Sequence, residues 1–173
     1  MATVGAPAAY CLRPITRADG PGLTRFYSGL SADSRFARFH GVVPTITDPT
    51  ATFFCGPDHE HREGIVAEYV DAAGDRSIIG HVCIEPMTDD VAEMAIAVAD
   101  AWQRHGVGRA MLASAIIWAR RRGISRLVAS LQCGNTALLG LVRSVGCPVT
   151  YGPAIAGTID ACLDLGNSRS VAA

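Results

Sequence analysis

The stretch of sequence that decides the fold is Val98-Ala-Asp-Ala-Trp-Gln-Arg-His-Gly-Val-Gly-Arg-Ala-Met111. A strand-like apolar segment leads into this stretch, and the pattern of an amphipathic helix follows its glycines. Gly106 and Gly108 permit a tight turn and a close approach of the backbone to a ligand. The first N–H groups of the following helix are unpaired, and the helix dipole strengthens their attraction for an anion. The stretch therefore predicts a phosphate-binding turn.

Two other glycine-rich phosphate-binding motifs do not match this turn. A P-loop requires Lys followed by Ser or Thr after its last glycine, and the chain contains no such spacing. A dinucleotide-binding turn requires a third glycine where Met111 stands and an acidic residue about 20 positions further on. Residues 125–130 supply no carboxylate. Both motifs are therefore excluded on their residues.

The length and charge of the chain predict one domain that does not bind nucleic acid. A chain of 173 residues buries about two-thirds of its unfolded surface around a single core. We expect residues 1–165 to form this domain and the small, polar residues 166–173 to be a disordered tail. The net charge of -1 provides no basic face for nucleic acid. The arginines at 120–122 are read as the solvated end of a helix.

The cysteines, the amino terminus and the histidines exclude other classes of protein. The six cysteines lack Cys-x-x-Cys spacing, so we expect reduced thiols. The first residues have neither the basic start nor the apolar run of a signal peptide, which predicts a cytoplasmic protein with no membrane partner. His59 and His61 lie on a polar loop with no third ligand at a defined spacing, so no metal site is predicted.

The hydrophobic pattern predicts alternating strands and helices. Strands are expected at residues 10–15, 65–70, 77–85, 91–99, 127–132, 149–151 and 158–163. Helices are expected after the turn at residues 20–22, from the Ser31 cap to Gly41, and at residues 106–122 and 135–145. Residues 44–64 show little periodicity, so they are expected to be a mobile connection with one helical turn around Thr52.

Gln103-x-x-Gly106-x-Gly108 resembles the pyrophosphate-binding motif of the GNAT superfamily, the acetyl-CoA-dependent N-acetyltransferases. The order of the surrounding elements resembles that superfamily over roughly residues 12–165, and Gly146 closes the Asn-headed helix at the family's spacing. The resemblance implies an α/β (α+β) GNAT fold. Its central sheet is expected to be mixed, mostly antiparallel, with six to seven strands and about four flanking helices. Acetyl-CoA is the implied cosubstrate.

The resemblance also implies how acetyl-CoA binds. In the superfamily, the strand before the turn splays from its neighbour, and its exposed backbone receives pantetheine as though it were another strand. Pyrophosphate then meets the N–H groups of the turn, with Arg104 or Arg109 adding charged contacts. Asn135 caps its helix and matches a residue that touches the cofactor in many relatives. The implied cofactor-binding residues are Ile96, Ala97, Val98, Gln103, Arg104, His105, Gly106, Val107, Gly108, Arg109 and Asn135.

Glu93 is the candidate general base. Strand alternation places it on one face with Ala95, Ala97 and Ala99, whose small side chains leave room for a substrate. In similar GNAT enzymes, including bacterial protein-lysine acetyltransferases, a glutamate at this position is the base. An amine with a pKa of about 10.4 must lose a proton before it attacks a thioester. Glu93 therefore needs either desolvation or a water relay, and the alternative is a structural carboxylate paired with an arginine.

Val142 stands where the family often has a tyrosine that protonates the leaving thiolate, seven residues after Asn135. A thiol pKa of about 8.5 allows CoA to leave as the thiolate, and Tyr151 or a water remains open as a substitute. The missing tyrosine is also the main support for a different class of protein. In that alternative, the chain is a non-catalytic acyl-CoA-binding regulatory module.

Protein lysine is the preferred acceptor. Residues 12–16 and 30–39 resemble the start of bacterial lysine acetyltransferases that act on metabolic enzymes such as acyl-CoA synthetases. Small amines, including aminoglycosides and polyamines, are the alternative acceptors. The sequence is compatible with a monomer or a homodimer.

Overall fold

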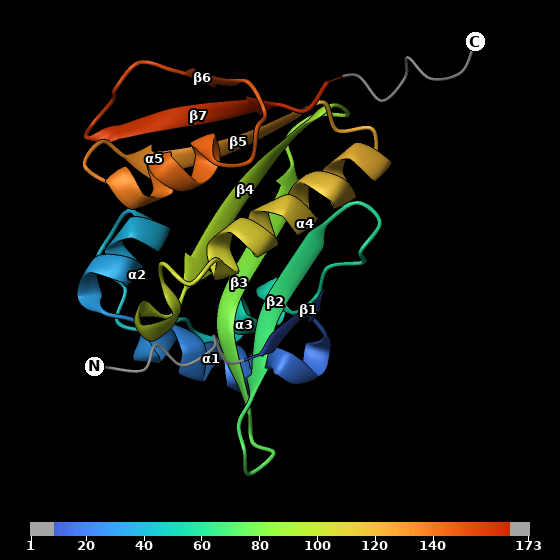
Figure 1. Cartoon of the computed structure of the whole chain (residues 1–173), viewed down its shortest axis with the longest axis vertical. Coiled ribbons are helices and arrows are strands. Elements are labelled where there is room, and N and C mark those ends of the chain that lie inside the picture. Colours follow the sequence, from blue (N-terminus) through green and yellow to red (C-terminus); the bar gives the residue numbers. More distant parts are fainter. Residues whose placement is uncertain (1–8, 167–173) are drawn as a thin grey trace, which may run out of the picture.

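Seven strands form one sheet in the computed structural model, which describes residues 9–166. The sheet order is β1-β2-β3-β4-β5-β7-β6 (Figure 1). The strands are β1 (Tyr10–Pro14), β2 (Glu63–Val70), β3 (Arg76–Pro86), β4 (Val91–Val98), β5 (Arg126–Gln132), β6 (Val149–Tyr151) and β7 (Thr158–Asp164). Neighbours run antiparallel except β4 and β5, which are parallel. The predicted mixed, mostly antiparallel sheet is therefore confirmed. Apart from Gly166, the predicted tail lies outside the described residues.

Helices cover both faces of the sheet (Figure 1). Among the described residues they are α1 (Gly20–Gly29), α2 (Ala32–Phe39), α3 (Asp48–Phe54), α4 (Val107–Arg121) and α5 (Thr136–Arg143), with short 3₁₀ helices η1 (Arg17–Asp19) and η2 (Asp100–Trp102). Helix α4 packs on one face, and α1 lies on the other.

Helix α3 corrects the prediction of a connection with a single helical turn around Thr52. The side chain of Thr47 caps the helix by accepting a hydrogen bond from the Thr50 N–H, and Pro49 stands in its first turn. Ala51 is buried in the core beneath α1. The helix is too short to show a hydrophobic period, and it is stabilised by its cap and this contact.

Strand alternation along β4 separates two cores. Ala92 and Met94 are buried in the larger core, together with Met111 and Leu112 of α4. Ala97 faces the smaller core instead, which contains Leu23, Phe26 and Tyr27 of α1. The predicted division of this strand into a small-residue face and a bulkier helix-facing side is therefore present in the structure.

The pairing between β4 and β5 ends early. Only Val91, Ala92 and Glu93 pair with β5, opposite Arg126, Leu127 and Val128. Beyond these residues the two strands separate, although each continues for several residues. This separation is the splay that the family resemblance implied, and it leaves the last part of β4 without a partner on its β5 side.

Gly64 marks a close approach between β2 and the residue after β1. A Cβ at this position would lie 2.5 Å from Ile15 Cγ2 and 3.4 Å from Pro57 Cγ. Ile15 is fully buried, so its side chain has little room to move. We predict that Gly64→Ala lowers the free energy of unfolding by about 1–3 kcal/mol, measured by urea denaturation.

Gly140→Ala is the matched control, because nothing lies within 4 Å of a Cβ at this position inside α5. Its free energy of unfolding is expected to rise by about 0.5–1 kcal/mol, since alanine is the better helix former. Equal stability of the two variants would contradict the packing argument.

Candidate functional site

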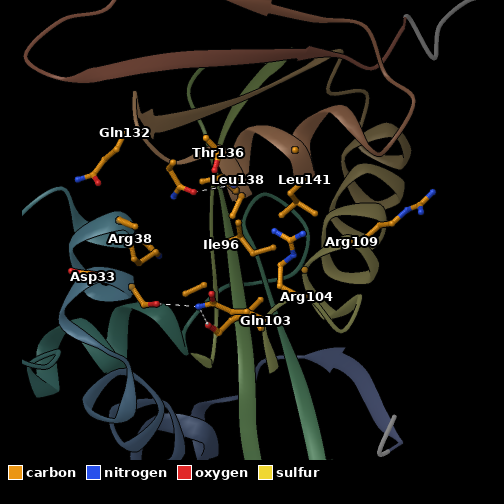
Figure 2. A pocket seen from close by; sticks show the side chains of 18 of the residues that line it. Asp33, Arg38, Ile96, Gln103, Arg104, Arg109, Gln132, Thr136, Leu138 and Leu141 are labelled. Atoms are coloured by element: carbon orange, nitrogen blue, oxygen red, sulfur yellow. Dashed lines mark hydrogen bonds between the residues drawn. The ribbon is translucent and has the colours of Figure 1, made fainter. Parts of the chain in front are cut away.

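A cleft of about 780 Å³ opens where β4 and β5 separate. Its walls come from α2, the end of β4, the turn before α4, the end of β5 and α5 (Figure 2). Most of the predicted cofactor residues line it, namely Ile96, Ala97, Val98, Gln103, Arg104, Gly106, Gly108, Arg109 and Asn135. His105 and Val107 do not line it. Val107 is buried in the larger core, and the exposed His105 ring contacts the Gln103 carbonyl oxygen at 2.8 Å.

The turn before α4 has the backbone conformation that its glycines allow. Gly106 is the N-cap residue with φ of 85°, a left-handed conformation that glycine adopts without strain. No side chain caps the helix. The Ala110 N–H donates to the Gly106 carbonyl at 3.0 Å. The N–H groups of residues 106–109 come before this first helical hydrogen bond and have no acceptor within the helix. They are therefore suited to binding an anion.

Gly108 keeps the passage between α4 and α5 open. A Cβ at this position would lie 3.3 Å from Leu141 Cδ2 and 3.6 Å from Val98 Cγ2. A larger side chain would fill the cleft from its floor. The second glycine of the motif is therefore required by space, whereas Gly106 is required by its backbone conformation.

Gln103 holds the turn in place. Its Nε2 donates to the Val98 carbonyl at 3.1 Å and to Ser34 Oγ at 3.0 Å (Figure 2). Asp100 accepts hydrogen bonds from the Ser31 N–H and from the hydroxyls of Ser31 and Ser34. These bonds tie the start of α2 to the turn. Sequence reasoning missed Asp100, because its partners lie about 70 positions earlier in the chain.

The two arginines of the motif differ in direction. Figure 2 shows the Arg104 side chain extending toward Leu141, whereas the Arg109 side chain points away from the cleft. Both belong to its lining, but only Arg104 extends over it.

Asn135, Val142 and Tyr151 occupy different surroundings. Asn135 Oδ1 accepts the Leu138 N–H at 3.0 Å, so the predicted cap of α5 is present. Val142 is fully buried in the larger core. The Tyr151 hydroxyl accepts a hydrogen bond from Arg143 Nε at 3.2 Å on the edge strand β6, away from the cleft residues. No tyrosine lines the cleft among the described residues.

A smaller pocket of about 250 Å³ adjoins the cleft, and both are lined by Arg38, Ile96 and Leu138. Glu93 belongs to its wall, and the Glu93 side chain is exposed. Within residues 9–166, this carboxylate forms no hydrogen bond or ion pair, so the alternative of an arginine-paired structural carboxylate is not observed. Its neighbour across the ladder, Glu85, is instead bound by Arg62 at 2.5 and 2.8 Å.

A buried polar cluster lies beneath α2. The Tyr27 hydroxyl and His81 Nδ1 are 2.9 Å apart, and both side chains are fully buried. Arg38 Nη2 donates to Cys83 Sγ at 3.1 Å. Burial lowers the pKa of His81 to about 3 and raises the pKa of Tyr27 to about 12. No sequence pattern indicates the proximity of these four residues, since they come from α1, α2 and β3.

The described part of the chain contains no cluster of three or more His, Cys, Asp or Glu side chains able to hold a metal ion. His59 contacts Glu63 at 2.5 Å, and His61 contacts Asp58 at 2.8 Å. None of the helices described in residues 9–166 combines the length and apolarity needed to span a membrane.

Comparisons with known proteins point to one family. Residues 31–146 match the family model "Acetyltransferase (GNAT) family". The GNAT domain of S. lividans PAT is 29% identical, with 88% of this chain and 89% of that chain covered and a TM-score of 0.77. No curated protein matches the chain.

Two further solved structures share the fold. A GCN5-related N-acetyltransferase from Kribbella flavida is 25% identical, with coverage of 91% of this chain and 98% of that chain and a TM-score of 0.68. A GNAT superfamily phosphinothricin acetyltransferase from Sinorhizobium meliloti, in complex with AcCoA, is 18% identical, with coverage of 91% and 89% and a TM-score of 0.70.

The burial of His81 predicts a pH dependence of stability. Its pKa is lowered from the ordinary value of 6.5 to about 3 in the folded protein. Below pH 6.5 the unfolded chain therefore binds a proton that the folded protein does not. The free energy of unfolding should fall from pH 6.5 toward pH 3, by at most about 1.4 kcal/mol per pH unit from this residue.

Urea denaturation between pH 7.5 and pH 4.5 measures this slope, and His81→Gln isolates the contribution of His81. The variant should lose less stability than the parent protein as the pH falls. Parallel curves for the two proteins would contradict the assignment.

Proposed function

The chain belongs to the acetyltransferase (GNAT) family, and on that premise we propose that it transfers the acetyl group of acetyl-CoA to a primary amine, with Glu93 accepting the amine proton. One observation carries the proposal. The cleft runs along the unpaired end of β4 from the turn at Gly106 to the pocket that contains Glu93.

The residues of the cleft fit acetyl-CoA. The free N–H groups at residues 106–109 suit its pyrophosphate, and Arg104 adds a positive charge beside them. The backbone of residues 96–98 has no strand partner on the β5 side, so its polar groups are available to the amides of pantetheine. Asn135 lies on the opposite wall. When bound, acetyl-CoA supplies a thioester carbon for the amine to attack and a thiolate as the leaving group.

Glu93 is the candidate base because its carboxylate is free. An acceptor amine with a pKa of about 10.4 arrives protonated and must lose one proton. The exposed Glu93 side chain favours proton transfer through a water rather than through a desolvated carboxylate. Glu85 lies opposite it, but its carboxylate is already bound to Arg62.

The departing thiolate has no tyrosine beside it in the described residues of the cleft. With a thiol pKa of about 8.5, the thiolate is a tolerable leaving group and takes its proton from solvent. This environment also supports the second candidate function, a non-catalytic acyl-CoA-binding module. The two candidates differ in turnover but not in cosubstrate affinity.

The acceptor must present its amine to the pocket of about 250 Å³ beside Glu93. A lysine side chain and a small-molecule amine both meet this requirement. The resemblance of residues 12–16 and 30–39 to bacterial lysine acetyltransferases supports protein lysine. The limited volume of the pocket supports a small amine.

Gly108→Val tests the assignment of the cleft. The added side chain enters the space bounded by Leu141 and Val98, so the dissociation constant for acetyl-CoA should rise at least about tenfold. Isothermal titration measures the change. Ala113→Val is the control, because it adds valine to the same helix at an exposed position outside the cleft. Unchanged affinity of Gly108→Val would refute the assignment.

Glu93→Gln tests the chemistry. Turnover, followed as thiol release with a panel of amines and lysine peptides, should fall by about 10²–10⁴ while acetyl-CoA affinity is kept. Raising the pH should restore part of the lost turnover, because solvent then deprotonates the amine. Glu85→Gln is the control and should keep most of its turnover. Binding of acetyl-CoA without thiol release by the parent protein would favour the non-catalytic module.

A further inference from the structure

The small pocket beside Glu93 carries charges of both signs. Glu93 lies on the β4 side, and Arg38 lies on the side formed by α2. The two side chains form no ion pair with each other. Arg38 also lines the larger cleft, so it stands at the junction of the two cavities.

The guanidinium of Arg38 lacks a carboxylate partner among the described residues. Its Nε is buried without a hydrogen-bond partner, and Nη2 donates to the weak acceptor Cys83 Sγ. The nearby Tyr27 hydroxyl and the charge of Glu93 raise the pKa of Arg38, but neither forms an ion pair with it. The guanidinium carbon lies 5.0 Å from the centre of the Phe39 ring and 5.4 Å from that of Phe54. Aromatic rings stabilise a cation, but they leave its N–H groups unsatisfied. Burial without an anion is costly, so the site is prepared for an anionic ligand.

Other arginines of the fold differ from Arg38 because they bind carboxylates. Arg13 binds Asp19 and Glu68, and Arg62 binds Glu85. Their carboxylates come from the protein itself. Arg38 is placed instead where a ligand reaches it.

The phosphates of acetyl-CoA do not suit this position. Arg38 contacts Cys83, which pairs with Ala95 on β4. The anion-binding turn begins after Val98, three residues and therefore about 10 Å further along β4. The anion at Arg38 must lie near the reacting amine instead. The acceptor is the remaining source of such an anion.

We propose that the acceptor is a free α-amino acid with an apolar side chain, held with its amine beside Glu93 and its carboxylate on Arg38. The proposal rests on the N-acetyltransferase function proposed above. A guanidinium offers paired N–H donors that match a carboxylate. The pocket volume of about 250 Å³ suits a small molecule, and Phe39, Met94 and Leu138 supply apolar lining. A lysine within a protein would bring no carboxylate to Arg38.

The reaction balances with these groups. The ammonium proton passes through a water to Glu93, and the amine nitrogen then forms a bond to the thioester carbon. The carbon–sulfur bond breaks and its electron pair leaves with the thiolate. The nitrogen releases its second proton to solvent and the thiolate takes one up from solvent, so the products are an N-acetyl amino acid and CoA. The carboxylate on Arg38 is unchanged, so Arg38 acts in binding and selection.

The test compares amino acids with their amides as acceptors. Leucine, methionine and phenylalanine, their carboxamides and a lysine peptide are assayed by thiol release with the parent protein and with Arg38→Met and Arg38→Lys. An amide differs from its acid in amine pKa as well as in charge. The ratio of kcat/KM values, acid over amide, is therefore compared between proteins, which cancels this intrinsic difference.

The parent protein should have an acid-over-amide ratio at least about tenfold higher than that of Arg38→Met, as expected for a lost charge-assisted hydrogen bond. Arg38→Lys should give an intermediate ratio. Arg35→Met is the matched control. Arg35 stands on the same helix, but its guanidinium donates to the carbonyls of Ser28 and Leu30 outside both cavities, so its ratio should equal that of the parent.

Equal ratios in the parent and Arg38→Met, or faster turnover of the lysine peptide than of every amino acid, would overturn the proposal. Calorimetric binding of the amino acid in the presence of CoA gives a second readout that does not need turnover. Binding that is lost in Arg38→Met, without thiol release from any acceptor, would support the amino acid site and refute the transferase function. Absence of binding together with absence of turnover would refute the amino acid site.

Discussion

The site depends on the early end of the pairing between strands β4 and β5. Strands β4 and β5 are parallel neighbours for three residues and then diverge, which leaves the backbone of residues 96–98 unpaired beside a cleft. Exposed backbone groups of this kind are normally a liability in a sheet, because they attract other strands. Here the divergence is held from both sides. On one side, Gln103 and Asp100 bind the start of α2, and on the other α5 packs over the larger core through Val142.

The sequence predicted those parts of the fold that depend on local backbone requirements. Gly106 and Gly108 stand out because one must adopt a positive φ and the other must leave space below Leu141. Because these two glycines mark a turn, the strand before the turn and the helix after it could also be predicted. Helix α3 was predicted only as a single turn around Thr52, because its stability comes from a threonine cap and a single buried alanine rather than from a hydrophobic period.

Those parts of the candidate site that the backbone forms could be predicted from the sequence. The cosubstrate residues form a nearly continuous segment, so a motif was enough to place most of them along one cleft. Arg38 was not identified, since no spacing in α2 shows that its guanidinium meets Cys83 of β3 under the rings of Phe39 and Phe54. Such a cluster exists only after three elements have packed, and propensity or periodicity does not encode it.

The pattern of satisfied and unsatisfied charge separates structural from functional residues in this fold. Glu68 and Glu85 are bound by arginines, so their charges stabilise the sheet. Glu93 lies directly opposite Glu85 on the ladder but remains unbound, and Arg38 remains without a carboxylate. An ion pair between Glu93 and Arg38 would satisfy both groups and close the pocket to a charged ligand. Their separation keeps a negative and a positive group available in one small pocket, at the end of the cleft where the acetyl group must be transferred.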